Sequence, residues 1–313
     1  MWARSLSARR CAEPGPFPSR PPRPALANSR SLQQFFNITR AAERPWYARG
    51  MPSQRPRANP KKMRTDQRSG VVVTETSEAE LRLQERIRQA QQEAVSEVLL
   101  PTPSPDLLQR VIEDADGFAE AATAKHLDPA SPPVACSTGC SHCCYQLVSV
   151  SAPEVFRIVR YLRASTSRIQ MEEVVGRVRS LDKATRGTSL KARVNIKKPC
   201  AFLSADGCCT IYAVRPLACS EFTSYDVQAC KRGKRIGFKP FGLIHEKARM
   251  IAFNAVRQGL QDGLAIAVPE ADTNWLELTA AVSTALDHAA PEQAWLSGEN
   301  IFAKSHLSQS GNR

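Results

Sequence analysis

The sequence predicts a mainly α protein whose helices pack around an irregular, loop-rich region that holds most of the cysteines. Three observations lead to this fold class. Apolar residues recur at helical spacing in several segments, no alternation of strand and helix patterns is visible, and eight of the ten cysteines fall between Cys136 and Cys219. A chain of 313 residues can bury a sizeable core without help from disulfides, and we expect residues 71–313 to form one helical domain.

The segment 1–70 is a basic extension that we expect to be disordered. It holds 15 Lys and Arg against 3 acidic residues, is rich in Pro and Ser, and shows no helical or strand period. It could be a transit peptide, a phosphate-binding tail or an upstream extension outside the working protein. We favour the last interpretation because Met51 and Met63 are alternative starts, so that residues 1–62 need not be translated.

Net charge argues against a nucleic-acid partner for the folded part. The whole chain carries +13, but beyond the extension 28 basic and 27 acidic residues nearly cancel. No apolar run of about 18 residues is present, so we expect no membrane span. The N-terminus also lacks the apolar stretch of a secretory signal, and we therefore expect a cytoplasmic protein with reduced thiols.

Two helices are expected at the start of the domain. The first has a capping box formed by Ser77 and Glu80, and its apolar stripe ends before Pro101. The second has Ser104 as its N-cap and Pro105 at its first helical position. Both stripes indicate that these helices pack against other elements.

Further helices are expected on both sides of an irregular stretch. A capping box at Ser151 begins one helix, and the apolar stripe of residues 174–181 predicts the next. Residues 193–222 show no sustained period and should be rich in loops. The helical period returns over residues 244–255, and Asp272 is a candidate cap for a last helix.

The cysteines form two groups that indicate a metal site. Four thiols fall within nine residues in the motif Cys136-x3-Cys140-x2-Cys143-Cys144. The second group consists of Cys200, Cys208, Cys209 and Cys219. Spacings of two or three residues let a tight turn aim two sulfurs at one ion, and Gly139 supplies the permissive backbone of such a turn. Adjacent cysteines are expected to diverge, so four to seven of the eight should be ligands.

A positive charge is expected beside these thiols. Thiolates around a divalent ion leave net negative charge, which the guanidinium of Arg215 can offset. Pro216 would suit the first turn of a short helix that carries Cys219. His142 and Cys230, the latter beside the basic run 231–235, are interpreted as surface features and receive no role.

The pattern of the two groups resembles the YkgJ-type cysteine-cluster family, described as a zinc- or iron-chelating domain. Its second half reads here Cys200-Ala201-Phe202-Leu203, Gly207-Cys208-Cys209-Thr210-Ile211-Tyr212, Arg215-Pro216-Leu217-Ala218-Cys219 and Phe222. The resemblance places the module at about residues 134–222. It implies the metal ligands Cys136, Cys140, Cys143, Cys144, Cys200, Cys209 and Cys219. Cys208 falls at a variable position of the pattern and is left out.

Zinc, iron or an iron–sulfur cluster is therefore the expected cofactor, since all-thiolate sites suit each of them. The competing hypothesis is an iron–sulfur protein that supports methyl transfer or redox chemistry, because flagellin lysine methylases carry a similar cysteine cluster. Cys136, Cys140 and Cys143 also have the spacing of a radical S-adenosylmethionine cluster, but the strands and the glycine-rich segment of those enzymes are missing. The sequence does not decide whether the protein is an enzyme.

Overall fold

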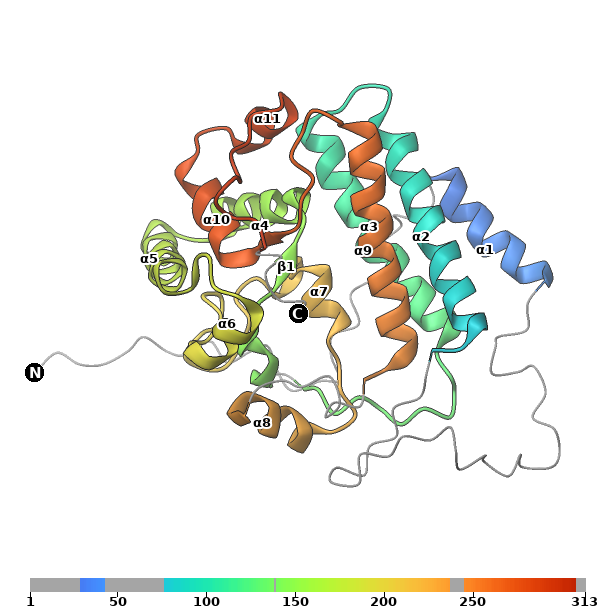
Figure 1. Ribbon diagram of the computed structural model, residues 1–313, viewed down its shortest axis with the longest axis horizontal. Coiled ribbons are helices and arrows are strands. Elements are labelled where there is room, and N and C mark those ends of the chain that lie inside the picture. Colours follow the sequence, from blue (N-terminus) through green and yellow to red (C-terminus); the bar gives the residue numbers. More distant parts are fainter. Residues whose placement is uncertain (1–28, 43–75, 138, 237–244, 308–313) are drawn as a thin grey trace, which may run out of the picture.

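The computed structural model describes residues 29–42, 76–137, 139–236 and 245–307, and it confirms the mainly α fold class (Figure 1). The helices are α1 (Arg30–Ala42), α2 (Glu78–Leu99), α3 (Pro105–His126), α4 (Ala152–Ser165), α5 (Arg168–Thr185), α6 (Leu190–Ile196), α7 (Leu217–Glu221), α8 (Val227–Ile236), α9 (Lys247–Ala267), α10 (Leu278–Asp287) and α11 (Pro291–Leu296). Two short 3-10 helices are η3 (His142–Tyr145) and η4 (Tyr212–Val214). Within these described residues, no helix combines the length and apolar character needed to cross a membrane.

The helices α2, α3 and α9 lie side by side and form one half of the fold (Figure 1). The predicted capping box of α2 is present: the Ser77 hydroxyl accepts the Glu80 N–H at 3.3 Å, and the Glu80 carboxylate accepts the Ser77 N–H at 2.7 Å. Two glycines let α9 approach α2 closely. A Cβ on Gly263 would lie 2.6 Å from the Cβ of Val95, which is too close for two carbon atoms. The absence of a side chain at Gly263 therefore allows the close packing of α9 on α2.

The helices α4, α5 and α10 form the other half, joined by a small antiparallel ribbon. Its strands are β1 (Ser149–Val150) and β2 (Leu276–Glu277), with Ser149 opposite Glu277. The capping of α4 at Ser151 and the stripe of α5 are as predicted. The predicted cap at Asp272 is wrong, because residues 276–277 pair as a strand and the Glu277 carboxylate accepts the Ala280 N–H at 2.8 Å.

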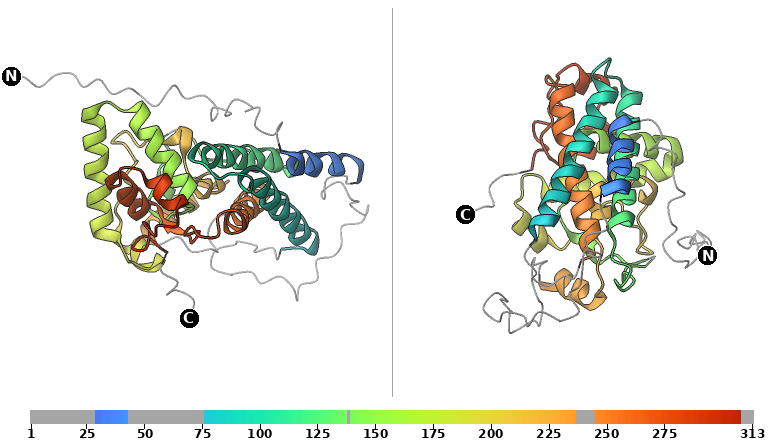
Figure 2. Two further views of the ribbon diagram at one scale, coloured as in Figure 1. Left: turned by 90° about the horizontal axis from the view of Figure 1, so that it is seen from above. Right: turned by 90° about the vertical axis from the view of Figure 1, so that its right-hand side faces the viewer.

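The helix α1 falls inside the segment that we expected to be disordered. It packs beside α2 (Figure 1 and Figure 2). Its Leu32 and Phe35 are buried, and the Phe35 ring meets Phe118 of α3 edge-on at 5.3 Å between centroids. Leu32 and Phe35 stand three residues apart in the sequence, a helical spacing that the Arg- and Pro-rich surroundings obscured. Residues 1–28 and 43–70, including Cys11, lie outside the described residues, and the proposed domain limits stay a prediction.

Candidate metal centre

The first cysteine group lies in a loop that leads into η3. Gly139 has φ +83°, and the Cys140 N–H bonds to the Ser137 carbonyl at 2.9 Å, which closes the tight turn expected at this position. The start of the loop is fixed from across the chain, because the Ala135 N–H donates to the Ser224 carbonyl at 2.8 Å.

The adjacent thiols of η3 face each other, contrary to the expectation that they diverge. A side-chain hydrogen bond from Cys144 lowers the pKa of Cys143 to about 7, and the guanidinium of Arg215 acts in the same direction against burial. The same contact, together with burial, raises the pKa of Cys144. Cys143 is thus the thiol of this pair that ionises near neutral pH, and ionised sulfur is the form that binds metal.

The second cysteine group begins in a loop that is bonded to the first. The Cys200 N–H donates to the Cys144 carbonyl at 2.7 Å. A bridge between Leu203 and Cys209 then folds the chain back on itself. The tip of this turn meets the first loop, since a Cβ on Gly207 would lie 3.2 Å from the Gly139 carbonyl oxygen. The two groups, separated by α4, α5 and α6 in the sequence, therefore come together in space.

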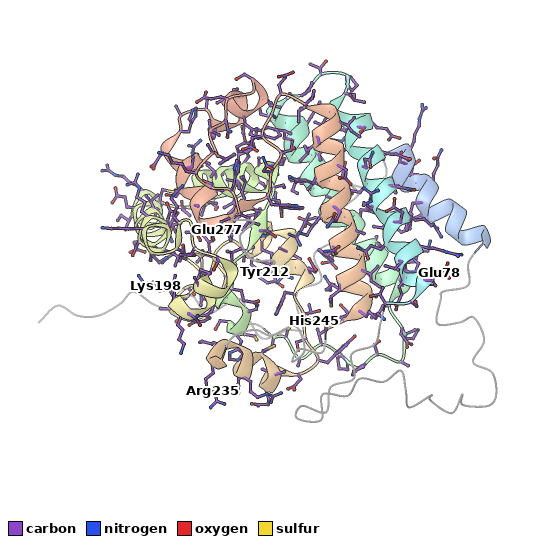
Figure 3. The ribbon with its side chains drawn as sticks, viewed as in Figure 1. Glu78, Lys198, Tyr212, Arg235, His245 and Glu277 are labelled. Atoms are coloured by element: carbon purple, nitrogen blue, oxygen red, sulfur yellow. The ribbon has the colours of Figure 1, made fainter. Side chains whose placement is uncertain are left out.

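Cys219 is delivered by the short helix α7, whose N-cap is Pro216. The proline thus precedes the helix by one residue, close to its predicted place in the first turn. Arg215 donates through Nε to the Ser220 hydroxyl at 2.9 Å, and its guanidinium lies 4.7 Å from the centre of the Tyr212 ring. Figure 3 shows Tyr212 toward the middle of the molecule in this view.

Burial controls the ionisation of the remaining thiols. It raises the pKa of Cys200 to about 12 and also raises the pKa values of Cys136, Cys209 and Cys219. The positive charge of Arg215 opposes this shift at Cys209 and Cys219, as expected for a guanidinium beside the site. These thiols are protonated when no metal is bound, so metal binding at neutral pH must release protons.

Cys230 is a member of the cluster that sequence reasoning missed. It is 6 % exposed, lies on α8, and its thiol hydrogen-bonds to Ser224. The Cys136 sulfur lies 4.0 Å from the carbonyl oxygen of the same Ser224. Cys140 and Cys143 also raise the pKa of Cys230, so its nearest thiols are those of the first group. In the sequence, only the cysteine itself indicated a further thiol ligand. The basic run that follows Cys230 favoured the interpretation of a solvated surface instead.

Arg193 of α6 is a second residue without a sequence signal. It is 1 % exposed and donates to the carbonyls of Tyr145 at 3.4 Å and Lys198 at 3.1 Å. It thereby ties the end of η3 to the segment before Cys200. The Lys234 ammonium of α8 lies 3.9 Å from the centre of the Tyr145 ring, so a second basic side chain contacts η3.

The donor set fits a thiophilic metal. The free thiols of the described residues are those of Cys136, Cys140, Cys143, Cys144, Cys200, Cys209, Cys219 and Cys230. Cys208 is not one of them. Within the part of the chain that the structure describes, no three His, Cys, Asp or Glu side chains already stand in a metal-holding arrangement. The chemistry of the donors suits zinc and iron.

His142 lies beside these thiols in η3. Burial lowers its pKa, and the nearby Lys234 and Lys231 lower it further. The imidazole is therefore neutral at physiological pH, which is the state of a metal ligand, but the thiols present supply enough donors without it.

Comparison with protein families supports metal binding by this region. Residues 135–236 match the CxxCxxCC family model, described as "Putative zinc- or iron-chelating domain". The matched segment runs from the residue before Cys136 to the end of α8, so it contains both cysteine groups and Cys230. Searches of curated proteins and of solved structures find no match to the chain.

Proposed function

We propose that this protein binds zinc or iron through cysteine thiolates of residues 135–236. The observation that carries the proposal is that the two cysteine groups lie side by side: the Cys200 N–H donates to the Cys144 carbonyl, and thiols of both groups and of Cys230 raise one another's pKa values. The predicted ligands remain Cys136, Cys140, Cys143, Cys144, Cys200, Cys209 and Cys219, to which we add Cys230. A bound metal would supply a positive centre that holds these loops in place. We also propose the YkgJ-type subfamily and a reducing, cytoplasmic location, which the many free thiols favour.

The protein's own residues prepare the site for this task. Cys143 ionises first because of its contact with Cys144, and it offers a thiolate to an arriving cation. Arg215 offsets the negative charge that gathers at Cys143, Cys209 and Cys219.

Anaerobic purification followed by elemental analysis and an absorption spectrum tests the proposal. Colourless protein with stoichiometric zinc would support a zinc site, while brown protein with iron and acid-labile sulfide would support an iron–sulfur cluster. The latter result alone would revive the hypothesis of methyl-transfer or redox chemistry, which no structural observation favours. Protein without either metal, with its cysteines disulfide-bonded in the cell, would refute the proposal.

Three single substitutions test the ligand set. Cys140→Ser and Cys209→Ser are expected to lower the metal bound per chain, because each removes a predicted ligand. Cys208→Ser is the matched control: it is the direct neighbour of Cys209 and lies outside the set of free thiols. Equal metal content in all three variants would show that the ligand set is wrong.

A further inference from the structure

The helix α7 is too short to be stable without contacts to other elements. It has five residues, fewer than an isolated helix needs to be stable in water, yet it carries the predicted ligand Cys219. Its Leu217 and Ser220 are buried at 0 % and 1 % exposure. Its place in the fold must therefore come from contacts with other elements.

Two residues of α4 hold the start of α7. The carboxylate of Glu154, which is fully buried, accepts the Leu217 N–H at 2.8 Å. The guanidinium of Arg157 donates to the carbonyls of Val214 at 3.4 Å and Arg215 at 3.2 Å. Arg157 is itself held by a buried ion pair with Asp116 of α3.

Two arginines of α9 hold the other end of α7. Arg257 forms an ion pair with Glu221 at 3.0 Å, the last residue of the short helix. Arg249 donates to the Ser220 carbonyl at 3.4 Å and pairs with Glu120 of α3 at 2.8 Å. Charged groups are thus bonded to both ends of α7, before and after Cys219 in the sequence.

We propose that α3 and α9, which lie outside the segment matched by the family model, complete the metal centre by fixing α7. Arg249 and Arg257 of α9, and Asp116 of α3 acting through Arg157, are positioning residues for Cys219. This inference rests on the proposed metal binding. Its consequence is that the chelating segment is built into the helical fold, so a change on α9 alters the metal site without touching a ligand.

Variants of Arg257 in the full chain test this role. Arg257→Gln removes the ion pair to Glu221, and Arg257→Lys keeps the charge. The matched control is Arg160→Gln on α4, which breaks an arginine ion pair with Glu292 away from α7. With Co²⁺ as the probe metal, we expect Arg257→Gln to bind about 10- to 100-fold more weakly, the range typical for lost outer-shell partners of metal ligands.

The cobalt titration also has a spectroscopic readout. Arg257→Gln should show a weaker thiolate-to-cobalt charge-transfer band per bound ion, because one sulfur is lost from the centre. Arg257→Lys should recover part of the affinity and of the band, and Arg160→Gln should match the wild type in both. Wild-type affinity and band intensity in Arg257→Gln would overturn the inference.

Alkylation of each thiol, measured by mass spectrometry in cobalt-saturated protein, separates positioning from general loss of structure. In Arg257→Gln we expect Cys219 to become reactive while Cys136 and Cys140 stay protected. Equal reactivity of all thiols in the variant, including through failure to fold, would overturn the inference, and so would unchanged protection of Cys219. Thiols that cobalt does not protect even in the wild type would refute the proposed function itself.

Discussion

The buried ion pair between Arg157 and Asp116 should dominate the stability of the contact between the two halves of the fold. The two side chains are 2 % and 1 % exposed, and the guanidinium also donates to the carbonyls of Val214 and Arg215. Arg157→Leu leaves the Asp116 carboxylate buried without its cationic partner. Removing one member of a buried pair typically costs about 3–5 kcal/mol, so we expect a loss of this size in the free energy of unfolding.

Two further variants show that burial of the charge is the cause. Asp116→Ala combined with Arg157→Leu removes both charges, and we expect it to be less destabilised than Arg157→Leu alone by about 1–4 kcal/mol. Arg160→Gln breaks a pair in which the arginine is 35 % exposed, and it should cost less than about 1 kcal/mol.

Urea unfolding of the reduced, metal-free protein, followed by circular dichroism, measures all three variants. The double-mutant comparison is valid if the slope of the unfolding free energy with urea is unchanged. A loss below about 1 kcal/mol in Arg157→Leu, or a double variant whose loss exceeds that of Arg157→Leu, would refute the reasoning.

Three other substitutions probe a titrating carboxylate, a helix contact and the added ligand. Burial raises the pKa of Asp114 to about 6, so the folded state holds this proton more tightly than the unfolded chain, and stability falls as the pH rises through this range. Asp114→Asn should therefore raise the free energy of unfolding at pH 8 by up to about 3 kcal/mol and have a smaller effect at pH 4; equal gains in urea titrations at both pH values would contradict this. Gly263→Ala should lower stability by about 1–3 kcal/mol in thermal unfolding, because its Cβ would lie 2.6 Å from the Cβ of Val95; an unchanged Tm would show that α2 and α9 can separate without cost. Cys230→Ser should lower the metal bound per chain in elemental analysis, whereas Cys208→Ser should leave it unchanged; the reverse order would remove Cys230 from the ligand set.

The helices were predictable where the signal is local. The capping residues Ser77, Ser104 and Ser151 stand directly before apolar stripes, and all three begin helices in the structure. The failed cap at Asp272 has a non-local cause, because β2 pairs with a strand that precedes it by more than a hundred residues. No window of sequence around Asp272 contains that partner.

The candidate site was predictable only in part for the same reason. The cysteines of the two groups could be recognised by their close spacing in the sequence. Cys230 comes near them only in the folded chain, where it and Cys136 both contact Ser224. Arg157 donates to the Arg215 carbonyl and Arg193 to the Tyr145 carbonyl, both far away in the sequence, and a single buried arginine has no sequence pattern. The ligand set itself remains a prediction.

X-ray absorption at the edge of the metal that co-purifies anaerobically tests thiolate chelation most directly, because it reports which atoms surround the ion. We predict a first shell of sulfur, at about 2.3 Å if the metal is zinc. A first shell dominated by nitrogen or oxygen would contradict metal binding by the cysteine cluster.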